Sequence, residues 1–237
     1  MILLTAMALA LAAPDTDERF MALLNAQQPE EAIAYLERGV AQDDPDSANI
    51  LAQLYDQGDM LVEQDHARAA QLYRQAAQGG IAYAQWRLGV MMDLGEGVES
   101  NPQAAIQWFS LAAAQHFADA LVSLAVMHAT GRGTRQDYAK ALDLYERAAR
   151  AGAMHGFYGL GVMHALGEGV AADPQEAMAY LIIADTMGVE DAGRVLGSDI
   201  FRDVDMDAAR DRATEIFEQY FPETNDNSEN AAGPQQG

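Results

Sequence analysis

The sequence predicts an all-α fold, a right-handed α-solenoid of helix-turn-helix repeats of about 36 residues. First, turn glycines recur at that spacing, at Gly95, Gly131 and Gly167. Second, alanine is abundant, whereas β-branched and aromatic residues are sparse outside fixed positions, which favours helices over strands. Third, an Asn or Asp recurs a few residues after each turn glycine, as is typical of a helix N-terminus.

The first helix of each repeat is predicted from residues that share one face. In the second repeat these are Ala84, Leu88, Gly89 and Met92, at spacings that place them together on a helix. The small residue after the leucine lets a neighbouring helix approach closely. The same pattern returns in the next two repeats, at Ala120, Leu124, Ala125 and His128, and at Gly156, Leu160, Gly161 and His164.

The turn after the first helix reads "LGEGV" at residues 94–98 and again at 166–170. A glycine pair of this kind could be taken for a phosphate-binding loop, but such a loop follows a strand and opens directly into a helix. Here a helix precedes the glycines. We therefore expect Gly95 and Gly167 to be left-handed helix C-caps, and we predict no cofactor.

The second helix of each repeat is predicted to begin at a capping residue: Asp65, Asn101, Asp137 or Asp173. Proline follows two of these residues, as expected at a first helical position. Glu176 stands three residues after Asp173, which is the spacing of a capping box. The predicted core residues of these helices are Tyr73, Phe109, Tyr145 and Leu181.

The repeat pattern divides the chain. Four repeats occupy residues 46–189, and residues 14–45 form an N-terminal helical capping pair. Residues 190–221 read as a degenerate C-terminal capping repeat, in which Asp203 replaces the turn glycine. Residues 222–237 carry almost nothing to bury and are predicted to be a disordered tail.

Residues 1–13 suggest export. A charge-free apolar run extends from Ile2 to Ala13 and ends abruptly at Pro14 and a cluster of acids. It is too short to span a bilayer but suits the hydrophobic region of a signal peptide, with two Ala-x-Ala cleavage sequences at residues 8–12. We therefore expect a periplasmic or secreted protein; the alternative is an ordinary apolar N-terminal helix.

The period, the paired glycines, the capping position and a closing Ala-Ala together resemble the Sel-one-like repeat family, whose repeats are similar to tetratricopeptide repeats. The resemblance covers about 60% of the chain. It implies an adaptor that presents a helical surface to other proteins, and exported bacterial members often regulate envelope or signalling partners. It implies no catalytic residue.

Charge and composition exclude several classes of function. Thirty-six acidic and 14 basic residues give a formal charge of −22, which would repel nucleic acid and anionic lipid. The chain has no cysteine, which excludes disulfides, thiolate metal sites and cysteine nucleophiles. We expect a protein or peptide partner, and a monomer or weak oligomer.

The histidines and acids do not predict a metal or catalytic site. His128 and His164 occupy equivalent places on helices about 8–10 Å or more apart, too far for shared zinc ligation. We expect them to substitute for Tyr55 of the first repeat and to form hydrogen bonds across repeats. No nucleophile elbow, Walker lysine or zinc-protease motif is present, so we predict no enzyme.

A stripe of apolar residues on the first helices is the candidate protein-binding groove. Asp56 and Asp93 are expected to form its acidic rim. The alternative is that the stripe packs between neighbouring first helices. Two other functions remain open: binding of cell-envelope glycan or peptidoglycan, and hydrolysis of envelope material. The stripe comprises Trp86, Val90, Val122, Val126, Tyr158 and Val162.

Overall fold

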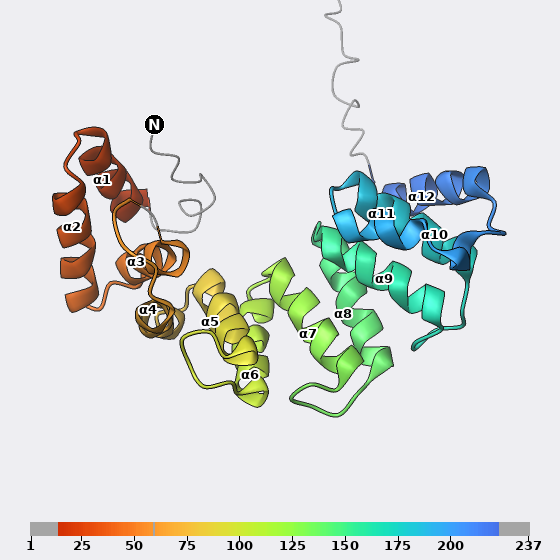
Figure 1. Cartoon of the computed structure of the whole chain (residues 1–237), viewed down its shortest axis with the longest axis horizontal. Helices are drawn as coiled ribbons and strands as arrows, with labels where there is room; N and C mark the ends of the chain where they lie inside the picture. The colour runs from red at the N-terminus through yellow and green to blue at the C-terminus, as the bar shows by residue number, and fades with distance from the viewer. Residues whose placement is uncertain (1–13, 59, 223–237) are drawn as a thin grey trace, which may run out of the picture. The chain divides into compact units, whose positions relative to one another are not determined.

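The computed structural model describes residues 14–58 and 60–222. Residues 1–13 and 223–237, where the signal peptide and most of the disordered tail are predicted, lie outside the described residues. The described part of the chain contains twelve α-helices, one short 3₁₀ helix and no strand, so the all-α prediction is confirmed (Figure 1). No helix in this part is long and apolar enough to span a membrane.

The helices follow one another through short connections. The nine helices from α2 to α10 are each 13 residues long. In chain order the elements are α1 (Pro14–Asn25), α2 (Pro29–Ala41), α3 (Pro45–Gln57), α4 (His66–Gln78), α5 (Ala82–Leu94), α6 (Pro102–Ala114), α7 (Ala118–Thr130), α8 (Tyr138–Arg150), α9 (Met154–Leu166), α10 (Pro174–Thr186), α11 (Glu190–Leu196), the 3₁₀ helix η2 (Asp199–Phe201) and α12 (Met206–Tyr220).

The chain forms two compact units, Met1–Leu144 and Tyr145–Gly237, with the boundary inside α8. In the first unit, α3 packs on α4 and α5 packs on α6, and consecutive pairs join through α4 and α5 and through α6 and α7. In the second unit, α10 contacts α9, α11 and α12.

Close helix packing depends on the small residues of the first helices. A Cβ added to Gly89 would come within 2.6 Å of the Phe109 ring, so α5 and α6 could not pack as they do with a larger residue there. Gly161 faces Leu181 at a comparable 2.7 Å in the second unit. The expectation that the residue after the leucine permits close approach is therefore confirmed, and the predicted core residue Tyr73 is fully buried.

The caps are as predicted. The side chain of Asp65 accepts a hydrogen bond from the Arg68 N–H, and that of Asn101 accepts one from the Ala104 N–H. Asp173 accepts from the N–H groups of Gln175 and Glu176. These side chains satisfy backbone donors that have no partner inside the helix, which is why each second helix begins where it does.

Candidate functional site

The turn between the two helices of a repeat is held by backbone atoms. Gly95 is left-handed, with φ 79° and ψ 29°, as the C-cap prediction requires. Gly97 is also left-handed, and a Cβ there would lie 2.2 Å from the His66 carbonyl oxygen at the start of α4. The first glycine therefore ends the helix, and the second lets the turn lie against the preceding repeat.

A backbone hydrogen bond closes each of the four turns, and we call it the turn clamp. The N–H of the capping residue donates to the carbonyl oxygen nine or ten residues earlier, near the end of the first helix. Because the clamp uses main-chain atoms, the side chain on the accepting residue is free to vary. The pairs are Asp65–Tyr55 at 2.8 Å, Asn101–Met92 at 2.6 Å, Asp137–His128 at 2.9 Å and Asp173–His164 at 3.0 Å.

In the first unit, the predicted stripe lies on α5 and α7, and every member is partly exposed: Trp86, Val90, Val122 and Val126. The indole N–H of Trp86 donates to the Ser123 hydroxyl at 3.0 Å, which joins α5 to α7. Its ring also lies 5.7 Å from the rings of Tyr83 and Phe117. Trp86 is thus held by three neighbours while part of its surface stays accessible.

In the second unit, Tyr158 and Val162 lie on α9 and are likewise partly exposed. The ring of the neighbouring Tyr145 is buried against Gly159, where an added Cβ would lie 2.3 Å from it. The first-helix positions therefore show the same partial exposure in each unit. Their assignment to a binding groove stays a prediction.

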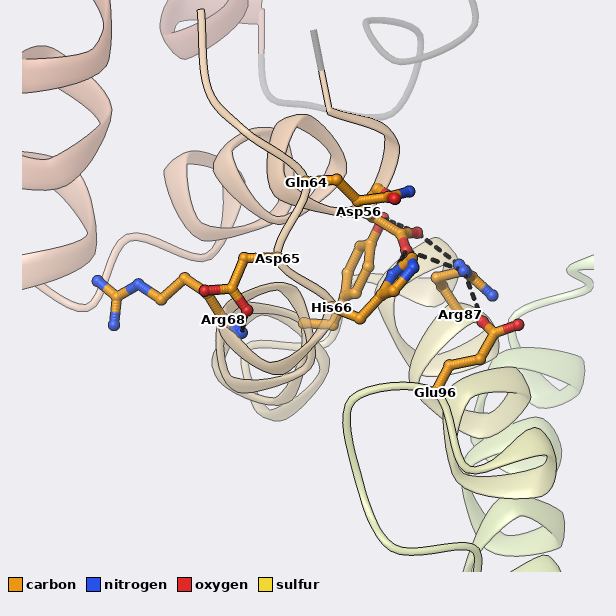
Figure 2. Close-up of polar contacts among 8 residues, drawn as sticks. Asp56, Gln64, Asp65, His66, Arg68, Arg87 and Glu96 are labelled. Atoms are coloured by element: carbon orange, nitrogen blue, oxygen red, sulfur yellow. Dashed lines mark hydrogen bonds and ion pairs between the residues drawn. The ribbon is translucent and has the colours of Figure 1, made fainter.

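The predicted acidic rim is wrong, because both acids are buried and paired with arginine. The Asp56 carboxylate is only 7% exposed and accepts two hydrogen bonds from Arg87, at 2.6 and 2.9 Å (Figure 2). The Asp93 side chain is equally buried and forms an ion pair with Arg132. Each arginine is more than 30 residues from its acid, so the pairing could not be recognised from local sequence.

Asp56 is the centre of a polar cluster that joins α3, α4 and α5. Besides Arg87, it accepts a hydrogen bond from the Tyr73 hydroxyl at 3.2 Å. Its carboxylate also contacts the His66 Nδ1 at 3.2 Å (Figure 2). Arg87 also donates to Glu96 at 3.0 Å. Burial lowers the pKa of Arg87, but the hydrogen bonds to Asp56 and Glu96 outweigh it and raise that pKa overall. The cluster satisfies its own charges and is a structural junction between repeats.

His128 and His164 do not form the expected hydrogen bonds through Nδ1. Both Nδ1 atoms are buried and have no hydrogen-bond partner. The His164 ring is instead stacked on Tyr180, with 5.4 Å between the ring centroids. The contact that each histidine makes with the next helix is instead the backbone hydrogen bond of the turn clamp.

The surroundings of the two histidines differ in charge. Burial lowers the pKa of His128, and Lys140 lowers it further while Asp137 opposes. Burial also lowers the pKa of His164, but Glu176 and Asp173 oppose that shift. The Glu176 carboxylate forms two hydrogen bonds with Arg212, at 2.7 and 3.0 Å, so the capping-box prediction for Glu176 is wrong.

His128 lines a cavity of 480 Å³ between the end of α7 and the start of α8. This cavity is polar, and the sequence analysis does not predict it. The one signal in the sequence is local charge, because residues 132–140 contain three of the 14 basic residues of the chain. Its walls are His128, Thr134, Arg135, Gln136, Asp137 and Lys140.

A larger cavity of 780 Å³ lies in the second unit between α10 and α12. Its lining includes Ile183 and Phe217, and the Phe217 side chain is 44% exposed. The same helix, α12, also buries Ala213 and Ile216. An apolar surface thus remains at the last helix of the array.

No group of three or more His, Asp or Glu side chains in the described part of the chain is arranged to hold a metal ion. Asp56, which contacts His66, is also bonded to Arg87.

Comparison with known proteins identifies the repeat. The Sel1 repeat model matches residues 26–44, 45–81, 82–117, 118–152 and 158–184, more than half of the chain. None of the curated proteins compared with the chain matches it.

Solved structures agree with this match. A Sel1 repeat protein from Oxalobacter formigenes is 30% identical, with a TM-score of 0.70 over 87% of this chain and 84% of that one. The c5321 protective antigen of uropathogenic Escherichia coli, described as having an SLR fold, is 28% identical with a TM-score of 0.67, over 78% of this chain and 41% of the antigen. An immunity protein of Pseudomonas aeruginosa shares the fold at 18% identity, with a TM-score of 0.51 over 88% of this chain and 83% of that one. With the family model matching most of its helices, the chain belongs to the Sel1 repeat family.

Proposed function

We propose that the chain is an exported, non-enzymatic scaffold that binds a basic segment of a protein partner on the first-helix stripe. Sel1 repeats generally mediate protein–protein interaction, and proteins built from them are typically non-enzymatic scaffolds. The partner would be an envelope or signalling protein whose activity the scaffold regulates.

The observation that supports this proposal most strongly is the setting of Trp86. A tryptophan that is fixed by a hydrogen bond to Ser123 and by two aromatic neighbours loses little freedom when a partner covers it. Tryptophan is also enriched among residues that dominate binding energy. The valines on α5 and α7 extend this anchor into an apolar surface.

The preference for a basic partner rests on the whole chain rather than on a local rim. Asp56 and Asp93 are bonded to arginines and cannot select a partner by charge. The formal charge of −22 remains, and a field of that sign accelerates association with positively charged segments at low ionic strength.

The first experiment places a photo-crosslinking amino acid at Val126 in cells that produce the protein. We expect a protein adduct to form when the rest of the stripe is unchanged. Trp86→Ala should reduce the yield of that adduct at least about tenfold, a loss typical of an interface hot spot. Crosslinks would be identified by mass spectrometry, and circular dichroism would establish that Trp86→Ala remains helical.

The matched control places the crosslinker at Leu111, a 50% exposed apolar residue on the second helix α6. Equal labelling from both positions, or labelling that Trp86→Ala leaves unchanged, would contradict the stripe assignment. Retention on purified envelope polysaccharide without a protein adduct would favour glycan binding instead. Export is tested by N-terminal sequencing of the mature protein, which should begin at Leu11 or Ala13 rather than Met1.

A further inference from the structure

The polar cavity beside His128 contains a lysine that plays no part in the proposed function. The chain has a single lysine, Lys140, and it lies in the first turn of α8 at this cavity. A cation there is unfavourable for the helix, because the positive end of the helix dipole lies at its N-terminus. The equivalent residue of the next repeat, Glu176, carries the charge that the helix prefers.

The two cations at the cavity form no ion pair with the acids around them. Neither Lys140 nor Arg135 forms an ion pair with any residue in the described part of the chain, although the chain is rich in carboxylates. Arg132, by contrast, is paired with Asp93 outside the cavity lining. Two unpaired cations in one cavity can both form charge-assisted hydrogen bonds with an anion.

The buried imidazole is an independent sign of a ligand. His128 is only 7% exposed, it lines the cavity, and its Nδ1 has no hydrogen-bond partner. A buried polar atom without a partner is unfavourable and is uncommon in folded proteins. Thr134 adds a hydroxyl to the same wall.

The remaining polar groups of the wall are already engaged. Gln136 donates from its amide nitrogen to the Ala129 carbonyl oxygen at 2.7 Å and to the Tyr138 hydroxyl at 2.9 Å. The carboxylate of Asp137 accepts the backbone N–H of Lys140 at 3.0 Å. One acid against two cations leaves the wall with a net positive charge, which favours an anionic ligand.

We propose that this cavity is a carboxylate-binding site, in which Lys140 and Arg135 hold the anion and Thr134 and His128 complete its hydrogen bonds. The carboxylate belongs to an acidic side chain or C-terminus of a polypeptide, or to a small organic acid. The site shares no residue with the first-helix stripe, so a test of one does not depend on the other.

The test follows the only lysine of the full-length protein by NMR. Its ε-methylene signal is monitored while sodium glutarate, a glutamate-rich peptide, sodium phosphate or sodium chloride is added at constant ionic strength and pH 7. We expect saturable shifts with glutarate or the peptide, accompanied by the His128 imidazole signal. Tighter binding of the peptide would identify a polypeptide as the source, and equal binding would identify a small acid.

The variants separate a built site from general charge attraction. Arg135→Gln should raise the glutarate concentration at half-saturation by about fivefold or more, and Lys140→Gln should do the same when the His128 signal is followed. The control Arg74→Gln removes one charge from an exposed position on α4 and should change nothing. The His164 signal is an internal control and should not move.

Three results would overturn the proposal. Shifts with phosphate that equal or exceed those with glutarate would show a phosphate site. Shifts that follow ionic strength alone, or that Arg74→Gln reduces as much as Arg135→Gln, would show general charge attraction. The absence of any saturable shift would show that the cavity binds neither anion.

Discussion

The turn at His128 and the turn at His164 occupy equivalent places in successive repeats, one in each compact unit. Both have a left-handed glycine C-cap and the same turn clamp, with lengths of 2.9 and 3.0 Å. Their side chains differ in charge: Arg135 and Lys140 in the first turn correspond to Ala171 and Glu176 in the second. Because backbone atoms hold the turn, its side chains can specialise without changing the repeat.

The largest expected effect tests whether the backbone holds the turn. Gly133→Ala should destabilise the protein by about 2–4 kcal/mol, because a left-handed alanine is strained and its Cβ would lie 2.7 Å from Pro102 backbone atoms. Gly131→Ala and Gly167→Ala should each destabilise it by only about 1–2 kcal/mol, since the nearest atom to the new Cβ is 3.2 Å away. Urea denaturation monitored by circular dichroism measures all three.

The ranking of the three glycine variants is the informative result. Equal losses for Gly131→Ala and Gly133→Ala would mean that the contact with the preceding repeat contributes nothing. A clear difference between Gly131→Ala and Gly167→Ala would mean that the two turns are not held in the same way.

An intermediate effect is expected when the charges of the two turns are exchanged. Glu176→Lys should destabilise the protein by about 1–2 kcal/mol, because it removes the paired hydrogen bonds to Arg212, places two cations together and opposes the helix dipole. Lys140→Glu should stay within about 0.5 kcal/mol of the parent, since Lys140 has no ion pair to lose. Thermal unfolding of both variants measures the difference.

A large loss on Lys140→Glu would contradict the view that Lys140 has no structural role. The control Glu176→Gln removes the negative charge without adding a positive one. It therefore separates the loss of the Arg212 pair from the repulsion introduced by lysine.

The smallest expected effect concerns pH. The folded-state pKa values of His128 and His164 are lowered from an ordinary value of about 6.5, so the unfolded state binds protons first as pH falls. Their contribution to stability is therefore complete above about pH 6.5 and decreases below it. The melting temperature should fall between pH 7.5 and pH 5.5. Replacing either histidine with tyrosine, the residue of the first repeat, should change the size of that fall by about 2 °C or less.

NMR titration of the imidazoles sharpens the comparison. Lys140→Gln should raise the pKa of His128, because it removes a neighbouring cation. Glu176→Gln should lower the pKa of His164 further, because it removes a neighbouring carboxylate. Shifts in the same direction at both histidines would contradict the difference in charge between the turns.

Local sequence was sufficient for the repeat and its helix boundaries. The residues that end and begin helices act over three or four positions, as Asp65 does with Arg68 and as Gly95 does at the end of α5. Such short-range signals can be read in order along the chain. Because each signal recurs at the repeat spacing, a weak cap in one repeat can be recognised from the equivalent residues in the others.

The candidate site was predicted less well, because burial depends on residues from another repeat. Asp56 was assigned to an exposed rim, yet Arg87, 31 residues later, covers it and pairs with it. Glu176 was assigned to a capping box, yet Arg212, 36 residues later, takes its carboxylate. A residue's own neighbours in sequence do not reveal such partners.

The sequence by itself determined the helices, the turns and the repeat family, since these depend on backbone preferences and apolar spacing within a single repeat. Only the tertiary structure decided which polar side chains are neutralised and which remain available. The physical reason is that stacking brings side chains one repeat apart into contact, and a charge in that contact must be paired or lose its solvation. By that criterion Asp56 is part of the junction between repeats, whereas Lys140 stays available to a ligand.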